Sequence, residues 1–311
     1  MDYDKFAEQR IAEIRKTVGG EVAISALSGG VDSSTVTVLG HRALGERLKT
    51  FIVDSGLLRE GEPGRVVRAM GSMGVHVEVV PEKDEFIAAL KGITDPEEKR
   101  QAITEVFYSR VFARLVRETG ARCLLQGTNL TDIEETVAGI KRQHNVLEQL
   151  GINPEAAYGY KVLEPLKTLR KDGVRELAAK LGLPPEVTRA IPFPGPALAA
   201  RIVGEVTEER LRTVRAATAI VEEELKDSGA FQYFAVLLND RATGIREGRR
   251  EVGQIIVVRC VDSVDARTAT AVELPWKKLR RVCNRIVEEV ADVNHCLYDL
   301  TPKPPAAIEY V

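Results

Sequence analysis

The segment from Ser28 to Ser34 combines glycines, hydroxyl groups and a carboxylate at one place in the chain. It reads Ser-Gly-Gly-Val-Asp-Ser-Ser and follows a short, mostly apolar stretch, residues 22–27, which predicts a buried strand. The residues after it, 35–44, are predicted to form a helix. Where a strand turns into a helix at two glycines, backbone N–H groups and the positive end of the helix dipole meet at one point. Such a point suits a phosphate group, which glycines allow the backbone to approach.

Two interpretations of this loop are open. The hydroxyl groups of Ser28, Ser33 and Ser34 add donors for a phosphate, and no lysine follows as in the Gly-x-x-x-x-Gly-Lys-Ser/Thr loop that holds a γ-phosphate. A serine-capped helix after a glycine turn would also produce the pattern. Because the motif lies directly after a buried strand, we favour the phosphate site. The residues predicted to form it are Ser28, Gly29, Gly30, Asp32, Ser33 and Ser34.

Strands and helices alternate through the first two thirds of the chain. Apolar periodicity predicts strands at residues 22–27, 48–53, 75–80 and 123–125 and helices at residues 4–18, 35–44, 60–73, 83–91 and 98–118. This alternation predicts an α/β fold with a doubly wound parallel sheet. In such sheets ligands bind beyond the carboxyl ends of the strands. We therefore expect the strand exits at residues 28–34, 54–59 and 126–135 to lie together.

Charged side chains at these exits are candidates for the same site. Asp32, Asp132 and Glu135 are carboxylates, and Mg²⁺ bound to a polyphosphate takes oxygen ligands of this kind. Arg59 is a cation that would hold a second anion. Each residue alone also has an ordinary interpretation, as a helix cap, a solvated acid or a surface arginine. Their expected convergence on one sheet edge favours a functional role.

The chain changes character at Pro192–Pro196, where three prolines within five residues mark a linker. Beyond it we predict a smaller α+β domain, with helices at residues 207–225 and 276–290 and strands at residues 234–238, 254–261 and 297–300. The predicted domains are residues 1–192 and 193–311. Residues 128–165 contain a stretch that is long and polar, and we expect a loop there that closes over the site as a lid.

Composition argues against several classes of protein. The 311 residues carry a net charge of −2, which does not suit a broad nucleic-acid surface. No apolar run approaches the roughly 20 residues of a membrane span, and the chain begins with polar, acidic residues. The cysteines occur singly in apolar surroundings, which predicts reduced core residues; they are Cys123, Cys260, Cys283 and Cys296. We therefore expect a cytoplasmic protein with neither a nucleic-acid nor a membrane partner.

The Ser28–Ser34 loop resembles the pyrophosphate-binding motif of the N-type ATP pyrophosphatase superfamily. Further segments narrow the resemblance to the GMP synthetase family, in the family's order and over nearly the whole chain. They are Asp54–Arg59, Gly92–Glu97, Gln126–Thr128, Ile140–Val146, Glu164–Leu166, Lys171–Arg175, Pro192–Pro196, Gln232–Leu238 and Lys303–Glu309. No segment resembles the family's glutamine amidotransferase domain, so the chain is similar to the separate synthetase subunit of two-subunit members.

The resemblance implies a ligase that uses ATP and Mg²⁺, with XMP and ammonia as the other substrates. The phosphate loop would hold pyrophosphate. Asp32, Asp132 and Glu135 would position metal or substrate, with Asp132 a candidate magnesium ligand, and Lys141 would approach from the lid. The residues implied to bind the acceptor nucleotide are Arg59, Gln232, Lys303, Ile308 and Glu309.

The resemblance also implies two protein partners. One is a separate glutamine amidotransferase subunit, because the cysteines show no nucleophile motif with which the chain itself would hydrolyse glutamine. The other is a second copy of the chain, paired through the C-terminal domain. We therefore expect a homodimer that works with ammonium and not with glutamine.

Departures from the family's pattern cluster where XMP would bind. Gln143–Glu148 lacks the glycines of the family's lid, residues 243–250 differ, and His295 replaces an arginine that helps to bind XMP. Candidates to supply the missing charge are Arg246, Arg249 and Arg250. Two alternatives are therefore considered, namely adenylation of a different acceptor carbonyl for amination or sulfur insertion, and nucleotide sensing without catalysis. Lys303 and Glu309 are retained, and for that reason we favour XMP.

Overall fold

Five parallel strands, in the order β3-β2-β1-β4-β5, form the sheet that carries the predicted phosphate loop. This computed structural model describes residues 1–137, 160–264 and 266–310. The strands are β1 Ala23–Leu27, β2 Leu48–Asp54, β3 Glu78–Pro81, β4 Cys123–Leu125 and β5 Lys161–Leu163. β1 pairs with β2 on one edge and with β4 on the other. The strand that leads into the loop is therefore the central one.

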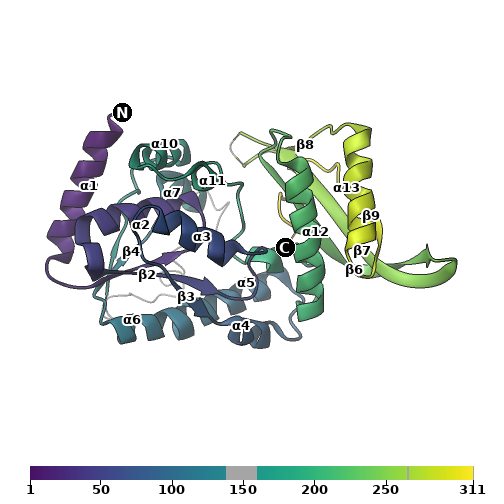
Figure 1. Cartoon of the computed structure of the whole chain (residues 1–311), viewed down its shortest axis with the longest axis horizontal. Coiled ribbons are helices and arrows are strands. Elements are labelled where there is room, and N and C mark those ends of the chain that lie inside the picture. Colours follow the sequence, from purple (N-terminus) through teal and green to yellow (C-terminus); the bar gives the residue numbers. More distant parts are fainter. Residues whose placement is uncertain (138–159, 265, 311) are drawn as a thin grey trace. The chain divides into compact units, whose positions relative to one another are not determined.

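Helices cover both faces of this sheet, which confirms the doubly wound prediction. α2 packs on β1, β2 and β4, and α1 and α10 pack against α2; Figure 1 shows α6 on the opposite side of the sheet. Because α2 lies between the sheet and these two helices, most of its residues are buried. The α-helices of this part are α1 Tyr3–Val18, α2 Val31–Leu44, α3 Glu62–Gly71, α6 Ala113–Thr119, α7 Leu130–Val137, α10 Lys171–Leu181 and α11 Pro185–Thr188. A short 3₁₀ helix covers Gly45–Arg47, and a π-helix covers Val106–Phe112 directly before α6.

A second, mixed sheet forms the core of the C-terminal part. β6 (Gln232–Arg246) and β7 (Arg249–Asp262) make an antiparallel hairpin, and β7 also pairs with β8 (Thr270–Ala271) and, in parallel, with β9 (Val293–Tyr298). α12 packs on β6 and α13 on β9. The helices of this part are α4 Lys83–Leu90, α5 Pro96–Glu105, α12 Glu208–Leu225, α13 Trp276–Glu289 and a short 3₁₀ helix at Ala197–Arg201. The predicted α+β arrangement is confirmed.

Two compact units make up the chain. Their boundaries differ from the single predicted boundary after residue 192. The first contains residues 1–54, 61–82 and 104–190, and the second contains residues 55–60, 83–103 and 191–311. Two segments that precede the linker thus belong to the C-terminal unit. The assignment of residues 1–192 and 193–311 as functional domains stays a prediction.

Hydrogen bonds explain why these two early segments belong to the second unit. On α12, Arg215 donates to the carbonyl oxygens of Gly56 and Leu58 at 2.5 and 2.9 Å. Lys99 on α5 donates from Nζ to the carbonyl oxygen of Ile202 at 2.7 Å. Because these partners are distant in sequence, the periodic pattern does not reveal them.

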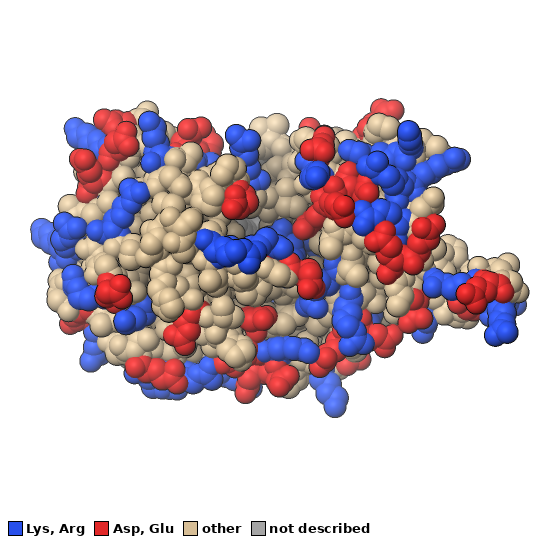
Figure 2. Space-filling view, in the orientation of Figure 1, with Lys and Arg blue, Asp and Glu red and all other residues tan. Residues whose placement is uncertain are grey.

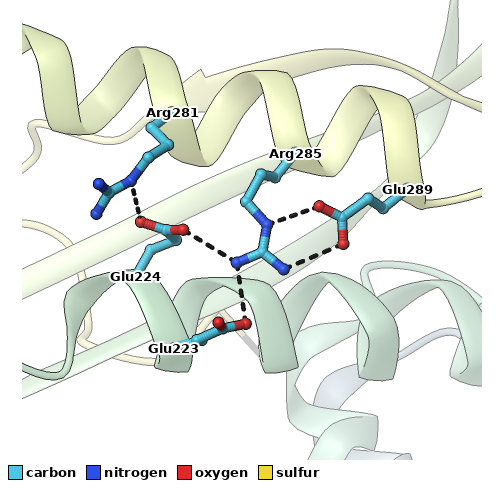
Figure 3. A network of polar contacts seen from close by, with 5 residues as sticks. All are labelled: Glu223, Glu224, Arg281, Arg285 and Glu289. Atoms are coloured by element: carbon cyan, nitrogen blue, oxygen red, sulfur yellow. Dashed lines mark hydrogen bonds and ion pairs between the residues drawn. The ribbon is translucent and has the colours of Figure 1, made fainter.

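A network of ion pairs joins α12 to α13 (Figure 3). Arg285 lies 2.9 and 3.0 Å from the carboxylates of Glu223 and Glu224, and 2.6 Å from Glu289 one turn further along α13. Arg281 also pairs with Glu224. Burial acts to raise the pKa of Glu224, but the hydrogen bonds from the two arginines outweigh it and hold the pKa below its ordinary value. The network therefore stabilises the pair of helices that pack on the second sheet.

Several regions differ from the predicted elements, among them β9, which covers Val293–Tyr298 and not residues 297–300. β6 and β7 run well beyond the predicted strands at residues 234–238 and 254–261. At the two ends of residues 128–165 the structure has α7 and β5, two elements that the sequence analysis did not predict. The rest of the predicted loop, residues 138–159, lies outside the described residues, and the lid prediction with it.

Charge and hydropathy of the described residues follow the composition. On the face shown in Figure 2, acidic and basic side chains are interspersed, in keeping with a net charge of −2. Across the described part of the chain, no helix has the length and apolar character needed to cross a membrane. The cytoplasmic location stays a prediction.

Candidate functional site

The turn from β1 into α2 places Ser28–Ser34 at the carboxyl end of the central strand. Gly29 has a φ of +79°, a left-handed conformation that suits glycine. A Cβ at Gly29 would also lie 3.2 Å from Oε1 of Glu62. α2 begins after Gly30, which has no side chain with which to cap the helix. The N–H groups of the first turn of α2 are therefore directed to the mouth of the loop, where an anion would bind.

The serine hydroxyl groups lie in two different environments. Oγ of Ser28 and Oγ of Ser33 are 3.0 Å apart, and the hydroxyl of Ser33 donates to the carbonyl oxygen of Gly30 at 3.1 Å. These two hydroxyls therefore meet across the loop at its open side. Ser34 is only 1% exposed, and its N–H donates to Gly30 at 3.1 Å in the first turn of α2. The role of Ser34 toward a phosphate stays a prediction.

The exit of β4 packs directly against the phosphate loop. A Cβ at Gly127 would lie 2.8 Å from the carbonyl carbon of Asp32 and 3.0 Å from the nitrogen of Ser33, closer than real Cβ atoms approach. Glycine at this position therefore allows Gln126–Thr128 to reach the start of α2. The structure confirms that the exits of β1 and β4 lie together.

Lys171 adds a cation beside the same loop. It is the first residue of α10, and its Nζ lies 3.9 Å from Oδ2 of Asp32. Both side chains are partly exposed, so an anion that enters the loop can reach the ammonium group. The sequence analysis assigned Lys171 no role of its own. The available signal was a lysine at the start of a predicted family segment, Lys171–Arg175.

The other predicted carboxylates are placed differently. Oδ2 of Asp132 accepts from the N–H of Asn129 at 3.2 Å, and Oδ1 of Asn129 accepts from the N–H of Asp132 at 3.0 Å. This reciprocal pair caps the start of α7, which is the ordinary interpretation of the residue. Glu135 lies one turn further along α7, and Lys141 lies outside the described residues. The roles of these residues toward metal or substrate stay predictions.

One carboxylate at the loop is suited to Mg²⁺. Among the described residues, no group of three or more His, Cys, Asp and Glu side chains could hold a metal ion by itself. Mg²⁺ in nucleotide sites takes one or two carboxylates and completes its shell with substrate phosphates and water. Asp32, a partly exposed carboxylate in the phosphate loop, fits that mode of binding.

In the second unit, two arginines flank the ring of Phe193. The guanidinium carbons of Arg59 and Arg201 lie 4.5 and 5.0 Å from the ring centre. Arg59 also contacts the carboxylate of Glu222 at 3.2 Å. Arg201 is 1% exposed, and its guanidinium carbon also lies 4.3 Å from the centre of the Phe234 ring. Phe193, a residue of the predicted linker, thus contacts both Arg59 and Arg201.

Glu309 meets Arg201 and Gln232. Arg201 donates from Nε and Nη2 to the two carboxylate oxygens of Glu309, each at 3.3 Å. Gln232 donates from Nε2 to Glu309 at 2.5 Å and to the carbonyl oxygen of Pro192 at 3.2 Å. Two predicted acceptor-site residues are therefore in contact. The sequence analysis missed Arg201, although a cation that ends the apolar run at residues 197–200 was a signal.

The remaining predicted acceptor-site residues of the second unit, Lys303 and Ile308, lie in the C-terminal segment. Lys303 donates from Nζ to the carbonyl oxygen of Ala266 at 2.8 Å. Ile308 is buried in a cluster with Phe234 and Val257, and is thus part of the core under the sheet. Because Ile308 is anchored in this way, the neighbouring residue Glu309 emerges at a defined place.

Residues 243–250 and His295, which differ from the family's pattern, lie on the β6–β7 hairpin and on β9. Nδ1 of His295 contacts Oδ1 of Asn294 at 2.9 Å. Arg246 contacts Glu251 at 3.2 Å and donates to the carbonyl oxygen of Val293 at 3.0 Å, so it secures the hairpin to β9. Whether an arginine of residues 243–250 replaces the missing charge stays a prediction.

A parallel α/β sheet with a glycine turn and a helix N-terminus beyond its central strand is an arrangement found in nucleotide-binding proteins. Comparison with known families agrees. A family model described as asparagine synthase matches residues 14–129, which contain Ser28–Ser34. A model described as GMP synthase C terminal domain matches residues 219–310, which contain Gln232, Lys303 and Glu309.

Individual relatives match over the whole chain. A subunit of the glutamine-hydrolyzing GMP synthase of Archaeoglobus fulgidus is 51% identical over 311 residues and covers 100% of both chains. The corresponding GMP synthase subunit of Pyrococcus furiosus is 48% identical, over 99% of this chain and 97% of its own. A solved NH3-dependent NAD synthetase from Campylobacter jejuni is 18% identical with a TM-score of 0.49, over 61% of this chain and 77% of its own. The chain belongs to the family of these GMP synthase subunits.

Proposed function

We propose that this chain converts XMP to GMP with ATP and ammonia. In the first step, the oxygen on C2 of XMP attacks the α-phosphorus of ATP and pyrophosphate leaves. In the second step, ammonia attacks C2 and AMP leaves with that oxygen. The products are GMP, AMP and pyrophosphate. The observation that carries the proposal is the glycine loop at the end of β1. It occurs in a chain of this family in which Arg201 and Gln232 donate hydrogen bonds to the carboxylate of Glu309.

The phosphate loop would bind the part of ATP that leaves. Backbone N–H groups at the start of α2 and the hydroxyls of Ser28 and Ser33 would donate to the pyrophosphate oxygens, and Lys171 would offset their growing charge. Mg²⁺, when bound, neutralises the phosphates and orients them, with Asp32 as the carboxylate that fits it. We include Asp132 and Glu135 as further positioning groups.

The second unit would bind the acceptor nucleotide. Arg59 and Lys303 are cations suited to the phosphate of XMP, because a guanidinium or ammonium group forms strong hydrogen bonds with phosphate oxygens. The carboxylate of Glu309, oriented by Arg201 and Gln232, would accept hydrogen bonds from the hydroxyl or N–H groups of the nucleoside. Ile308 would contribute through its backbone, and Lys141 would approach from the lid.

Ammonia would come from a separate glutamine amidotransferase subunit. All four cysteines are free thiols. Burial raises the pKa of Cys123, that of Cys260 to about 11 and that of Cys296 to about 12. Thiols with raised pKa values are poor nucleophiles, so we expect none of these three to hydrolyse glutamine. We further propose that two copies of the chain pair through the second unit.

The test is an assay of AMP and pyrophosphate release by the purified chain. We expect release to require XMP and ammonium together, and glutamine not to replace ammonium. Asp32→Ala should abolish release and leave the fold intact by circular dichroism. Release of AMP and pyrophosphate that does not depend on XMP would favour a different acceptor carbonyl. ATP binding without release of either product would favour a nucleotide sensor without catalysis.

A further inference from the structure

Arg259 is a buried cation in the middle of an apolar strand. It lies on β7 among Val257, Val258 and Val261, and its side chain is 0% exposed. Arginine is almost never fully buried unless its charge is paired. Because side chains alternate along a strand, Arg259 faces the same side as Val257 and Val261. That side carries the buried cluster that includes Ile308, so Arg259 points toward the C-terminal segment.

Three acceptors surround the guanidinium group. Nε donates to the carbonyl oxygen of Ile308 and Nη2 to that of Ala307, both at 2.9 Å. Nη1 donates to Oδ2 of Asp299, the residue after β9, at 2.5 Å. The hydroxyl of Tyr310 donates to the same carboxylate oxygen at 2.7 Å. One side chain of the central strand thus holds the backbone of the C-terminal segment and the carboxylate that secures its last described residue.

The two carbonyl contacts define the conformation at Ile308. Each peptide unit is planar, and the carbonyls of Ala307 and Ile308 belong to the planes on either side of Ile308. Holding both oxygens in one rigid fork therefore sets the direction in which the chain enters Glu309. A lysine has one nitrogen at this place and cannot hold three acceptors in a plane.

We infer that Arg259 is a positioning residue of the acceptor-nucleotide site, and that it acts through the backbone at Ala307 and Ile308 to place Glu309. The inference rests on the proposed function of Glu309. Removing Arg259 alone breaks its ion pair with Asp299, which costs stability because the carboxylate loses its charged partner. The KM for ATP separates that general effect from a change at the acceptor site. The specific contribution of the arginine is the direction of the segment, which packing alone does not set.

The experiment compares Arg259→Lys and Arg259→Met with the wild type and with Arg285→Met as control. Arg285 is an ion-paired arginine of the same unit whose partners lie on α12 and α13. We expect both Arg259 variants to raise the KM for XMP roughly tenfold or more, equivalent to about 1.4 kcal/mol, and the KM for ATP to stay within about twofold. Amide hydrogen exchange at residues 306–310 should become at least about tenfold faster without any substrate. Arg285→Met should change neither quantity.

The outcomes separate this inference from the proposed function. The requirement for XMP is measured first in the wild type, and its absence there overturns the proposed function and the inference with it. If the wild type requires XMP, an unchanged KM for XMP in both Arg259 variants overturns the inference alone, whatever the exchange rates. A parallel rise in the KM for ATP also overturns it, because that pattern indicates a general loss of structure. If Arg259→Met does not fold, Arg259→Lys alone decides the outcome, because it keeps the positive charge and cannot hold both carbonyl oxygens in one planar fork.

Discussion

Lys99 allows a direct test of the packing in the second unit, because its ammonium group is buried. The side chain is 0% exposed, and Nζ donates at 2.7 Å to the carbonyl oxygen of Ile202, the residue after Arg201. Burial and the nearby charge of Arg210 lower the pKa of Lys99 from 10.5 to about 8, although Asp95 acts in the opposite direction. The folded protein therefore holds this proton less tightly than the unfolded chain does.

The sign and size of the effect on stability follow from this difference. Below pH 8 both states are protonated, and the cost of the buried charge is fully present. Between about pH 8 and 10.5 the unfolded state binds more protons, so the free energy of unfolding rises with pH. A difference of about 2.5 pKa units corresponds to about 3.4 kcal/mol, of which roughly 2.4 kcal/mol falls between about pH 7.5 and 10.

The assay is urea unfolding of the wild type and of Lys99→Met across that pH range. We expect the difference between their free energies of unfolding to change by about 2 kcal/mol in favour of the wild type as the pH rises. Taking the difference removes the contribution of the buried cysteines, which titrate in both proteins. Lys83→Met is the control, because Lys83 is an exposed residue that pairs with Glu208 at 2.9 Å. A difference that stays flat, or that moves in favour of the variant, would refute the reasoning.

The remaining predictions concern the loop and the helix pair. Gly127→Ala would place a Cβ 2.8 Å from the backbone of Asp32, and we expect the KM for ATP to rise at least tenfold, or about 1.4 kcal/mol. Gly71→Ala is its control, since a Cβ there would meet nothing within 4 Å; equal values for the two variants would contradict the close approach. Arg285→Met leaves Glu224 with one cation fewer, and we expect urea unfolding to show a loss of about 1 kcal/mol. No loss would mean that water replaces the network.

The turn from β1 into α2 at Ser28–Ser34 could be predicted from the sequence because the features that form it are local. The long hairpin of β6 and β7 could not, because only the halves that pack on other elements carry an apolar pattern. Between Leu238 and Gln254 most side chains are polar and exposed, and strand pairing and a few polar contacts, such as that from Asn294 to the carbonyl oxygen of Ala242, hold the backbone. Asn294 of β9 lies against this part, where a Cβ at Gly244 or Gly253 would come within 2.5 or 2.6 Å of its side chain. Single-sequence reasoning does not detect a fit between such distant residues.

The predicted acceptor site shows a second limit of prediction from sequence. This limit depends on which group a buried arginine contacts. Glu309 is oriented by Arg201 and the backbone before it by Arg259, and the sequence analysis assigned a role to neither arginine. A cation within an apolar segment was a usable signal, because a buried charge has to be paired. It does not identify the partner when the partner is a carbonyl oxygen, since every residue has one. Motif matching located Glu309, and only the fold locates the two guanidinium groups that define where its carboxylate lies.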